Sequence, residues 1–119
     1  MKYLCLIYGD ESQLSHMTQE QGQAMMGEYW AFTDGIQKSG HYLAGEALKP
    51  VQTATTVRVR NGKMSTTDGP FAETKEQLGG FYMVDAKDLN EALQIAARIP
   101  GAKHGSIEVR PVEVFDRPS

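Results

Sequence analysis

The chain has 119 residues, which is enough for one domain and too few for two. Its 40% hydrophobic and 23% charged residues are typical of a globular protein, and its formal net charge of −3 argues against nucleic acid as the main partner. The single cysteine, Cys5, excludes an intramolecular disulfide and a thiolate metal cluster. No stretch approaches the roughly 20 apolar residues of a membrane span. We therefore expect a cytoplasmic protein that binds neither nucleic acid nor membranes.

The first part of the chain predicts a strand, a helix and a second strand. Residues 3–8 are apolar at every position, which indicates a strand covered on both faces. A polar loop is expected over residues 10–15, and Thr18 with Gln21 then forms a candidate capping box at the start of a helix. Residues 41–48 predict the second strand, weakened by Gly45. The core of the helix is expected to include Met25, Tyr29, Trp30 and Phe32.

The rest of the chain predicts a hairpin, a strand, a helix and a last strand. Alternating Val and Arg residues end at Arg60, and Asn61-Gly62 follows, a strong hairpin signal because both turn positions need positive φ. Residues 80–84 are again apolar on both faces, and residues 106–110 alternate as in a half-exposed strand. Asp88 caps the second helix, whose buried stripe is expected to be Leu89, Ala92, Leu93, Ala96 and Ala97.

This order of elements predicts an α+β, ferredoxin-like βαββαβ sandwich with an inserted β-hairpin and both helices on one face of the sheet. In that topology the two strands that are apolar on both sides, 3–8 and 80–84, lie at the centre. The helices cover one face only, and a monomer would leave an apolar sheet face in water. We therefore expect a homodimer that packs through this sheet face.

The segment 68–80, Asp-Gly-Pro-Phe-Ala-Glu-Thr-Lys-Glu-Gln-Leu-Gly-Gly, is the most distinctive in the chain. Asp68-Gly-Pro-Phe71, Glu73-Thr-Lys-Glu76 and Gly79-Gly80 resemble the signature of the DGPF-type proteins of the YCII-related family. The resemblance covers nearly the whole chain and implies a single YCII-related domain over residues 1–119. Its other matching stretches are Gly45-Glu46, residues 53–60, Asp88-Leu-Asn-Glu-Ala-Leu93 and Ile107-Glu-Val-Arg-Pro111.

The resemblance implies a dimeric α/β barrel of ferredoxin-like subunits, in agreement with the patterning. Most proteins of this kind are uncharacterised, and some relatives are associated with extracytoplasmic-function sigma factors. The wider family is similar to small enzymes with a His–Asp pair in a pocket beside the sheet, and one branch acts on chlorinated hydroxylated aromatics. The histidine of that pair lies inside the first helix, and residues 18–39 of this chain contain none. The pair is therefore not carried over, and Asp68 remains a candidate for its acidic partner.

Four ionisable residues are candidates for chemistry: Glu46, Arg58, Asp68 and Lys75. Glu46 interrupts an apolar strand, so its carboxylate must face water or pair with a cation, and Arg58 and Arg60 on the hairpin are candidate partners. Asp68 and Lys75 lie between the hairpin and a central strand, where the edge of a cleft can shift pKa values toward neutrality. The structural alternatives are an Asx-turn for Asp68 and a plain ion pair for Glu46.

Two functions of different classes remain open. The first is a small cofactor-independent enzyme, with the four candidates around one cavity and acid–base chemistry on a small anionic or aromatic molecule. The second is a non-catalytic small-molecule-binding or sigma-factor-associated regulatory module with an exposed apolar patch beyond the dimer interface. We expect no metal site, since no two histidines stand at ligand spacing.

Overall fold

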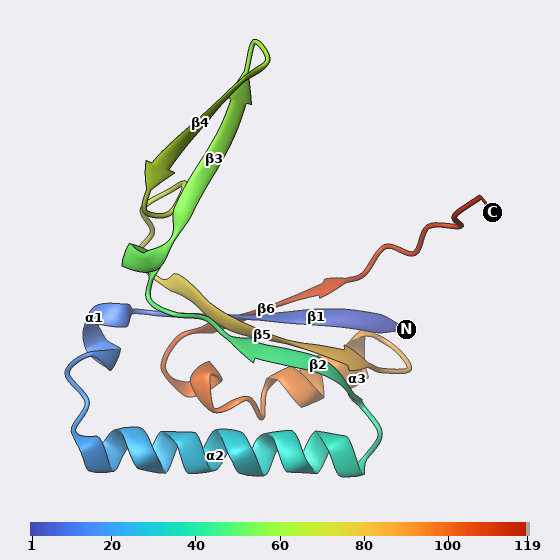
Figure 1. The fold of residues 1–119 in the computed structure, drawn as a ribbon. Coiled ribbons are helices and arrows are strands. Elements are labelled where there is room, and N and C mark those ends of the chain that lie inside the picture. The colour runs from blue at the N-terminus through green and yellow to red at the C-terminus, as the bar shows by residue number, and fades with distance from the viewer. Residues whose placement is uncertain (119) are drawn as a thin grey trace.

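The computed structural model describes residues 1–118 and shows a helix-covered sheet with a separate hairpin (Figure 1). The order of elements is the α+β order expected from the sequence and is compatible with a ferredoxin-like fold. The strands are β1 (Lys2–Gly9), β2 (Tyr42–Ala47), β3 (Thr55–Arg60), β4 (Lys63–Asp68), β5 (Gln77–Asp85) and β6 (Ser106–Pro111). The helices are α1 (Glu11–Leu14), α2 (Gln19–Lys38) and α3 (Leu89–Ala96), with single 3-10 turns η1 (Val51–Thr53) and η2 (Pro100–Lys103).

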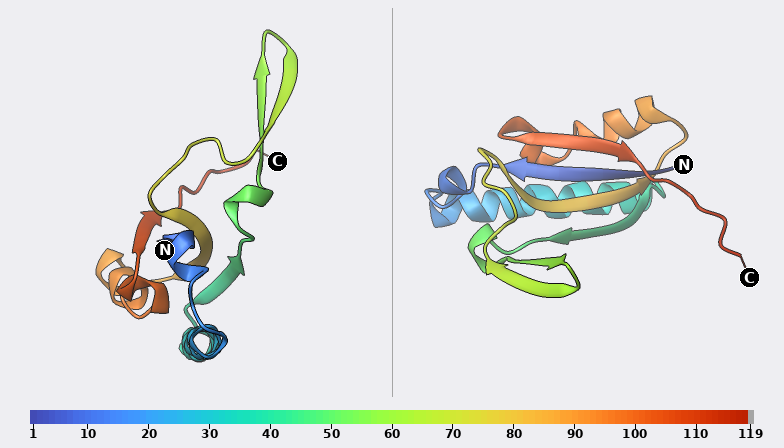
Figure 2. Two further views of the ribbon diagram at one scale, coloured as in Figure 1. Left: turned by 90° about the vertical axis from the view of Figure 1, so that its left-hand side faces the viewer. Right: turned by 90° about the horizontal axis from the view of Figure 1, so that it is seen from above.

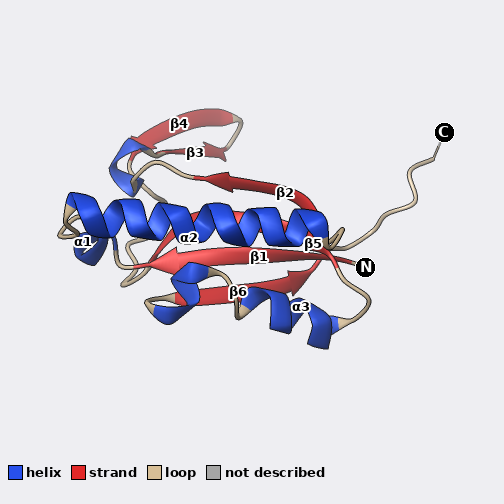
Figure 3. Cartoon of the chain, turned by 90° about the horizontal axis from the view of Figure 1, so that it is seen from below, coloured by secondary structure: helices blue, strands red, loops and turns tan. Residues whose placement is uncertain are grey.

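Four antiparallel strands form the main sheet in the order β2-β5-β1-β6. The two central strands are therefore β1 and β5, as the sequence predicts, and Leu4 pairs with Met83 and Leu6 with Phe81 across them. Seen from below, α2 and α3 lie over the same face of this sheet (Figure 3). We call the opposite face, which no helix covers, the open face.

The core lies between the sheet and the two helices. Strand alternation turns Tyr3 and Cys5 of β1, and Tyr82 and Val84 of β5, toward the helices, where each is at most 9% exposed. The rings of Phe32 and Tyr82 meet edge to face with their centroids 5.0 Å apart. Burial raises the pKa of the Cys5 thiol to about 11, so this side chain is a small core hydrophobe.

The local signals in the sequence are confirmed where they concern caps and turns. The Gln21 N–H donates to Thr18 Oγ1 at 3.1 Å, and the Thr18 N–H donates to Gln21 Oε1 at 2.9 Å, which completes the capping box. The Glu91 N–H donates to the Asp88 carboxylate at 2.9 Å. In the hairpin turn, Asn61 has φ 52° and Gly62 has φ 73°.

The predicted core stripe of α2 is wrong in part. Phe32 is buried, whereas Met26 and Trp30 are 54% and 64% exposed. Neighbouring positions on a helix point about 100° apart, so Met25 and Tyr29 turn toward the sheet and the residues after them turn away. Of the helices in residues 1–118, none is both long enough and apolar enough to cross a membrane.

The buried stripe of α3 also differs from the prediction. Ala92 and Ala96 are buried as expected, but Ile95 is buried with them, and Leu89 and Leu93 are nearly half exposed. The face centred on Ala92 and Ile95 continues into the buried Ile99 after the helix, so this line of residues packs on the sheet. The two leucines lie beside that line and remain in contact with water.

The packing around β2 requires a glycine at position 45. A Cβ on Gly45 would lie 2.8 Å from Cδ1 of the Tyr82 ring, and one on Gly80 would lie 2.8 Å from the Glu46 carbonyl oxygen. Gly45 therefore leaves room for the Tyr82 ring, and Gly80 allows the backbones of β2 and β5 to approach.

The hairpin and residues 112–118 extend from the body of the molecule on the side of the open face (Figures 1 and 2). All of β4 is exposed, and so is all of β3 except Thr56. The Cα radius of gyration is 16.7 Å, whereas a compact domain of this length is expected to have about 13.5 Å. The main sheet with its helices is therefore compact, and two segments reach beyond it.

Candidate functional site

Two adjoining clefts lie at the end of the sheet where β1 ends and β5 begins. The first cleft, of about 590 Å³, lies between α1 and η1. The second cleft, of about 540 Å³, lies against residues 70–74, in the connection from the hairpin to β5. Val51, Gln52 and Gln77 line both clefts, so the two form one continuous depression.

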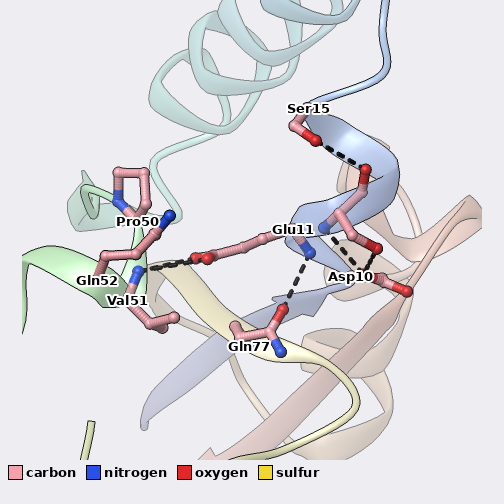
Figure 4. A pocket seen from close by; sticks show the side chains of 8 residues that line it. Asp10, Glu11, Ser15, Pro50, Val51, Gln52 and Gln77 are labelled. Carbon is pink, nitrogen blue, oxygen red and sulfur yellow. Dashed lines mark hydrogen bonds between the residues drawn. The ribbon is translucent and has the colours of Figure 1, made fainter. Parts of the chain in front are cut away.

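The first cleft is built by a short helix that the sequence did not predict. Asp10 begins α1 by accepting hydrogen bonds from the Ser12 hydroxyl at 2.6 Å and from the Ser12 N–H at 2.9 Å, and these bonds lower the pKa of Asp10. The Glu11 carboxylate then accepts from the Val51 N–H at 3.2 and 3.3 Å (Figure 4). The Asp10 and Glu11 carboxylates are thus occupied, and Glu11 fastens η1 to α1.

Gln77 joins the two clefts through both ends of its side-chain amide. Its Oε1 accepts from the Glu11 N–H at 2.9 Å, and its Nε2 donates to the Thr74 carbonyl oxygen at 2.6 Å. Further along the connection, the Glu76 carboxylate accepts from the Ser106 hydroxyl on β6 at 2.8 Å. The segment 69–76, which we call the 69–76 loop, is therefore held to α1, β5 and β6.

The second cleft has largely apolar walls. A register shift between Ile7 and Tyr8 pairs Tyr8 with Leu78 and leaves Gly79 as the extra residue of a β-bulge, so the two paired side chains line the same cleft. Phe71 is 81% exposed at the edge. The complete lining is Tyr8, Val51, Gln52, Pro70, Phe71, Ala72, Glu73, Thr74, Gln77 and Leu78.

Tyr8 gives the second cleft a hydrogen-bonding group. Its hydroxyl donates to the Glu108 carboxylate at 3.3 Å. Loss of hydration raises the pKa of Tyr8, and the negative charge of Glu108 raises it further, so the hydroxyl stays protonated at neutral pH. The Tyr8 hydroxyl can still accept a hydrogen bond, and with Glu73 on the lining the cleft combines apolar walls with groups that can hydrogen-bond a ligand.

The four predicted site residues lie apart in the single chain. Glu46 is on the open face opposite Phe81, Arg58 is on β3, Asp68 ends β4, and Lys75 is in the 69–76 loop; all four are exposed. Within residues 1–118 there are three ion pairs, and none includes any of the four. None of the four lines either cleft.

His41 holds a structural position away from the clefts. Its Nδ1 lies 2.6 Å from the Ser39 hydroxyl, and its Nε2 lies 3.2 Å from Glu91 Oε1, which ties the connection between α2 and β2 to α3. Among the described residues, no group of three or more His, Cys, Asp or Glu side chains could hold a metal ion.

The lining of the second cleft could be anticipated only in part, because the distinctive segment 68–80 supplies many of its residues whereas Tyr8 and Gln52 carry no comparable signal. Tyr8 looked like the last residue of an apolar strand, and Gln77 stood among charged neighbours that attracted more attention. The glycines Gly79 and Gly80 were the available signal, because glycine inside a strand often marks a bulge that redirects the neighbouring side chains.

The comparisons with known proteins cover nearly the whole chain. Residues 1–116 match the model of the YCII-related domain, so the match includes both clefts and the hairpin. The chain is 38% identical over 117 residues to an uncharacterised protein of Rhizobium meliloti (strain 1021), and the alignment spans 97% of this chain and 94% of that protein. The chain therefore belongs to the YCII-related family.

Proposed function

We propose that this protein binds a small phenolic molecule in the second cleft. The observation that carries the proposal is the cleft itself, whose volume of about 540 Å³ is formed partly by the distinctive segment Pro70–Thr74. Ligand sites in proteins typically measure about 300–1,000 Å³ and pair apolar walls with a few polar groups. The second cleft has both properties, whereas in the first cleft the Asp10 and Glu11 carboxylates are occupied by hydrogen bonds from Ser12 and Val51.

The charges around the second cleft favour a phenol over an anion. Among the described residues that line it, the charged side chain is Glu73. A carboxylate at this position repels an anionic ligand and accepts a hydrogen bond from a hydroxyl group. A flat ring would lie between Tyr8, Leu78 and Phe71, with its hydroxyl toward Glu73.

Acid–base catalysis is the function that this proposal replaces. It requires Glu46, Arg58, Asp68 and Lys75 to act on one ligand, and the single chain leaves these side chains in separate places. Binding in the second cleft needs none of them, so we base the proposed function on binding.

The test is a titration of the protein with phenol, catechol and benzoate, followed by amide chemical shifts. We expect phenol and catechol to move the signals of Gln77 and Leu78, and benzoate to bind more weakly. Phe71→Ala should weaken phenol binding about tenfold by removing an aromatic wall. Trp30→Ala is the matched control, because Trp30 is an exposed aromatic residue on α2, outside the cleft lining.

Glu73→Gln tests the charge argument separately. The substitution keeps the shape of the side chain and removes its charge, so benzoate should then bind nearly as well as phenol. The proposal is wrong if benzoate already binds the original protein as tightly as phenol does. It is also wrong if Trp30→Ala weakens binding as much as Phe71→Ala.

We also propose that two copies pack through their open faces. Leu4, Leu6, Phe81 and Met83 alternate onto this face and are only partly covered within one chain. The hairpin and residues 112–118 rise on the same side and expose further apolar side chains (Figure 1). A second copy would remove this apolar surface from water, and each sheet would form one wall of the dimeric barrel.

Sedimentation equilibrium tests the dimer. We expect a mass of twice the 13.1 kDa of one chain. Leu6→Lys, which places a charge in the middle of the open face, should give the mass of a monomer with an unchanged circular-dichroism spectrum. Leu93→Lys is the control, because Leu93 is a partly exposed leucine on α3, on the other side of the sheet. A monomeric original protein, or a Leu6→Lys variant that stays dimeric, contradicts the proposal.

A further inference from the structure

The β3–β4 hairpin is an incomplete sheet. It consists of two strands, and in the described chain neither pairs with a third. Isolated two-stranded hairpins are at best marginally stable in water, and their outer edges carry backbone groups that can pair with another strand. The hydrogen bonds at its base, from the Gly69 N–H to the Ala54 carbonyl at 2.7 Å and from the Thr56 hydroxyl to the Gly69 carbonyl at 2.9 Å, hold it only where it begins and ends.

The two faces of the hairpin have different chemistry. Val57, Val59 and Met64 lie on one face, with Val59 directly opposite Met64, and they are between 57% and 70% exposed. The other face carries the three basic residues Arg58, Arg60 and Lys63, with Arg60 opposite Lys63. A strand that pairs with an edge of this hairpin must therefore carry apolar side chains on one face and groups that bind cations on the other.

In residues 112–117, Val-Glu-Val-Phe-Asp-Arg, the first four residues have this composition. The segment stands between Pro111 and Pro118 and contains no proline itself. It is six residues long, the same length as β3. The Val112 N–H still donates to the Lys2 carbonyl oxygen at 3.0 Å, and beyond this bond the segment extends away from the body (Figure 1), with Val114 76% and Phe115 82% exposed. A short proline-free stretch of β-branched and aromatic residues favours a strand.

We propose that residues 112–117 of a second copy add to the β3–β4 hairpin of the first as a third strand. This inference rests on the dimer of the proposed function and names the contact that completes it. In a strand, Val112 and Val114 share one face and would extend the apolar face of the hairpin. Glu113 and Phe115 then share the other face, where a carboxylate and an aromatic ring are both suitable partners for guanidinium groups.

The ends of the sheet from which the hairpin and residues 112–118 extend explain why the partner is a second copy. Pro111 pairs with Tyr3 near the start of β1, whereas Gln77, which follows the hairpin connection, pairs with Gly9 at its end. Residues 112–118 and the hairpin of one chain therefore rise from opposite ends of the open face (Figure 1). A two-fold axis between the sheets and across the strands exchanges these ends and brings each terminal segment to the hairpin of the other copy.

The experiment is an isotope-filtered NMR measurement on mixed dimers. One copy is labelled with ¹³C and ¹⁵N, the other is unlabelled, and the two are refolded together. We expect contacts from the methyl groups of Val57, Val59 and Met64 in the labelled copy to the methyl groups of Val112 and Val114 in the unlabelled copy. If the mixed sample is dimeric and these contacts are absent, or if they occur only within one chain, the inference is wrong and the dimer stands.

A chain that ends at Pro111 provides the second measurement, by hydrogen exchange. If the truncated protein is still a dimer, the hairpin amides should exchange at least about tenfold faster than in the full chain, while β1 and β5 keep their protection. Unchanged hairpin protection in a truncated dimer overturns the inference. A full-length protein that sediments as a monomer overturns both the dimer and this contact, so the two failures are distinguishable.

Discussion

The body of this molecule and its hairpin are both made of antiparallel strands, but they are stabilised differently. In the body, β1 and β5 carry apolar side chains on both faces, and α2 and α3 bury one of these faces. In the hairpin, the turn at Asn61-Gly62 has the expected backbone conformation, and yet nearly every side chain is exposed. Turn chemistry and pairing thus specify the shape of a hairpin, whereas its stability has to come from something that packs against it.

The largest difference between the two regions is expected from removing one apolar side chain in each. Ile36→Ala deletes a fully buried side chain of the body and should lower the free energy of unfolding by about 2–5 kcal/mol. Met64→Ala deletes an exposed side chain of the hairpin and should cost about 0.5 kcal/mol in a single chain. Urea denaturation at several protein concentrations measures both. If the Met64→Ala cost rises with concentration, the hairpin is covered in the dimer; equal costs for the two variants would contradict the comparison.

Two glycine substitutions within the body should have opposite signs. Gly45→Ala pushes a methyl group against the Tyr82 ring, whose hydroxyl lies 2.7 Å from that of Thr33, and should destabilise the protein by about 1–3 kcal/mol. Gly27→Ala lies within α2 with nothing within 4 Å of its new Cβ, and should stabilise by about 0.5–1 kcal/mol. Thermal denaturation distinguishes them, and two shifts in the same direction would show that the close approach of β2 and β5 is not the reason for Gly45.

Removing a helix cap in the body should lower the free energy of unfolding more than removing a hydroxyl group in the hairpin. Thr18→Ala removes the acceptor for the Gln21 N–H at the start of α2 and should cost about 1 kcal/mol. Ser65→Ala, on β4, removes a 3.5 Å contact to the Arg58 carbonyl and should change stability by only a few tenths of a kcal/mol. Denaturation midpoints of the two variants provide the measurement, and a larger shift for Ser65→Ala would reverse the order.

The smallest expected effect is a pH dependence at the start of α1. Hydrogen bonds from the Ser12 hydroxyl and N–H lower the pKa of Asp10 in the folded protein, so this carboxylate stabilises the fold above its unfolded pKa. That contribution is lost as the pH falls through the lowered folded value. Ser12→Ala should bring the pKa of Asp10 closer to its usual value of 3.8, as measured by NMR titration of the carboxyl carbon. An unchanged titration would show that the hydroxyl does not contribute.

The fold could be predicted largely because its signals are local. Strands that are apolar at every position, the capping box at Thr18 and the turn at Asn61 each determine one element, and together they fix the order of the elements. The predicted burial was wrong where helical periodicity alone could not decide which face of a helix packs on the sheet. Both residues of the pair Tyr29 and Trp30 are aromatic, and only the position of α2 on the sheet decides which of them is buried.

The candidate site was much harder to predict than the fold. Ionisable residues such as Glu46 and Lys75 attract attention in a sequence, but they indicate chemistry only when the fold brings them together, and in one chain it does not. The second cleft instead depends on Tyr8 and Leu78, two ordinary strand residues that share a cleft because of a bulge. Such a register shift is a long-range property of two paired strands, which a single sequence shows only through its glycines.

The bulge at Gly79 divides β5 into two stretches, and mutations in the two have different consequences. Residues from Gly80 onward hold the register that places Tyr82 and Val84 in the core, and this register is set after the extra residue. Substitutions at exposed positions of residues 69–75 are therefore expected to leave the core pairing in place while they change the walls of the second cleft. A protein engineer can randomise these exposed positions as a library on a constant scaffold.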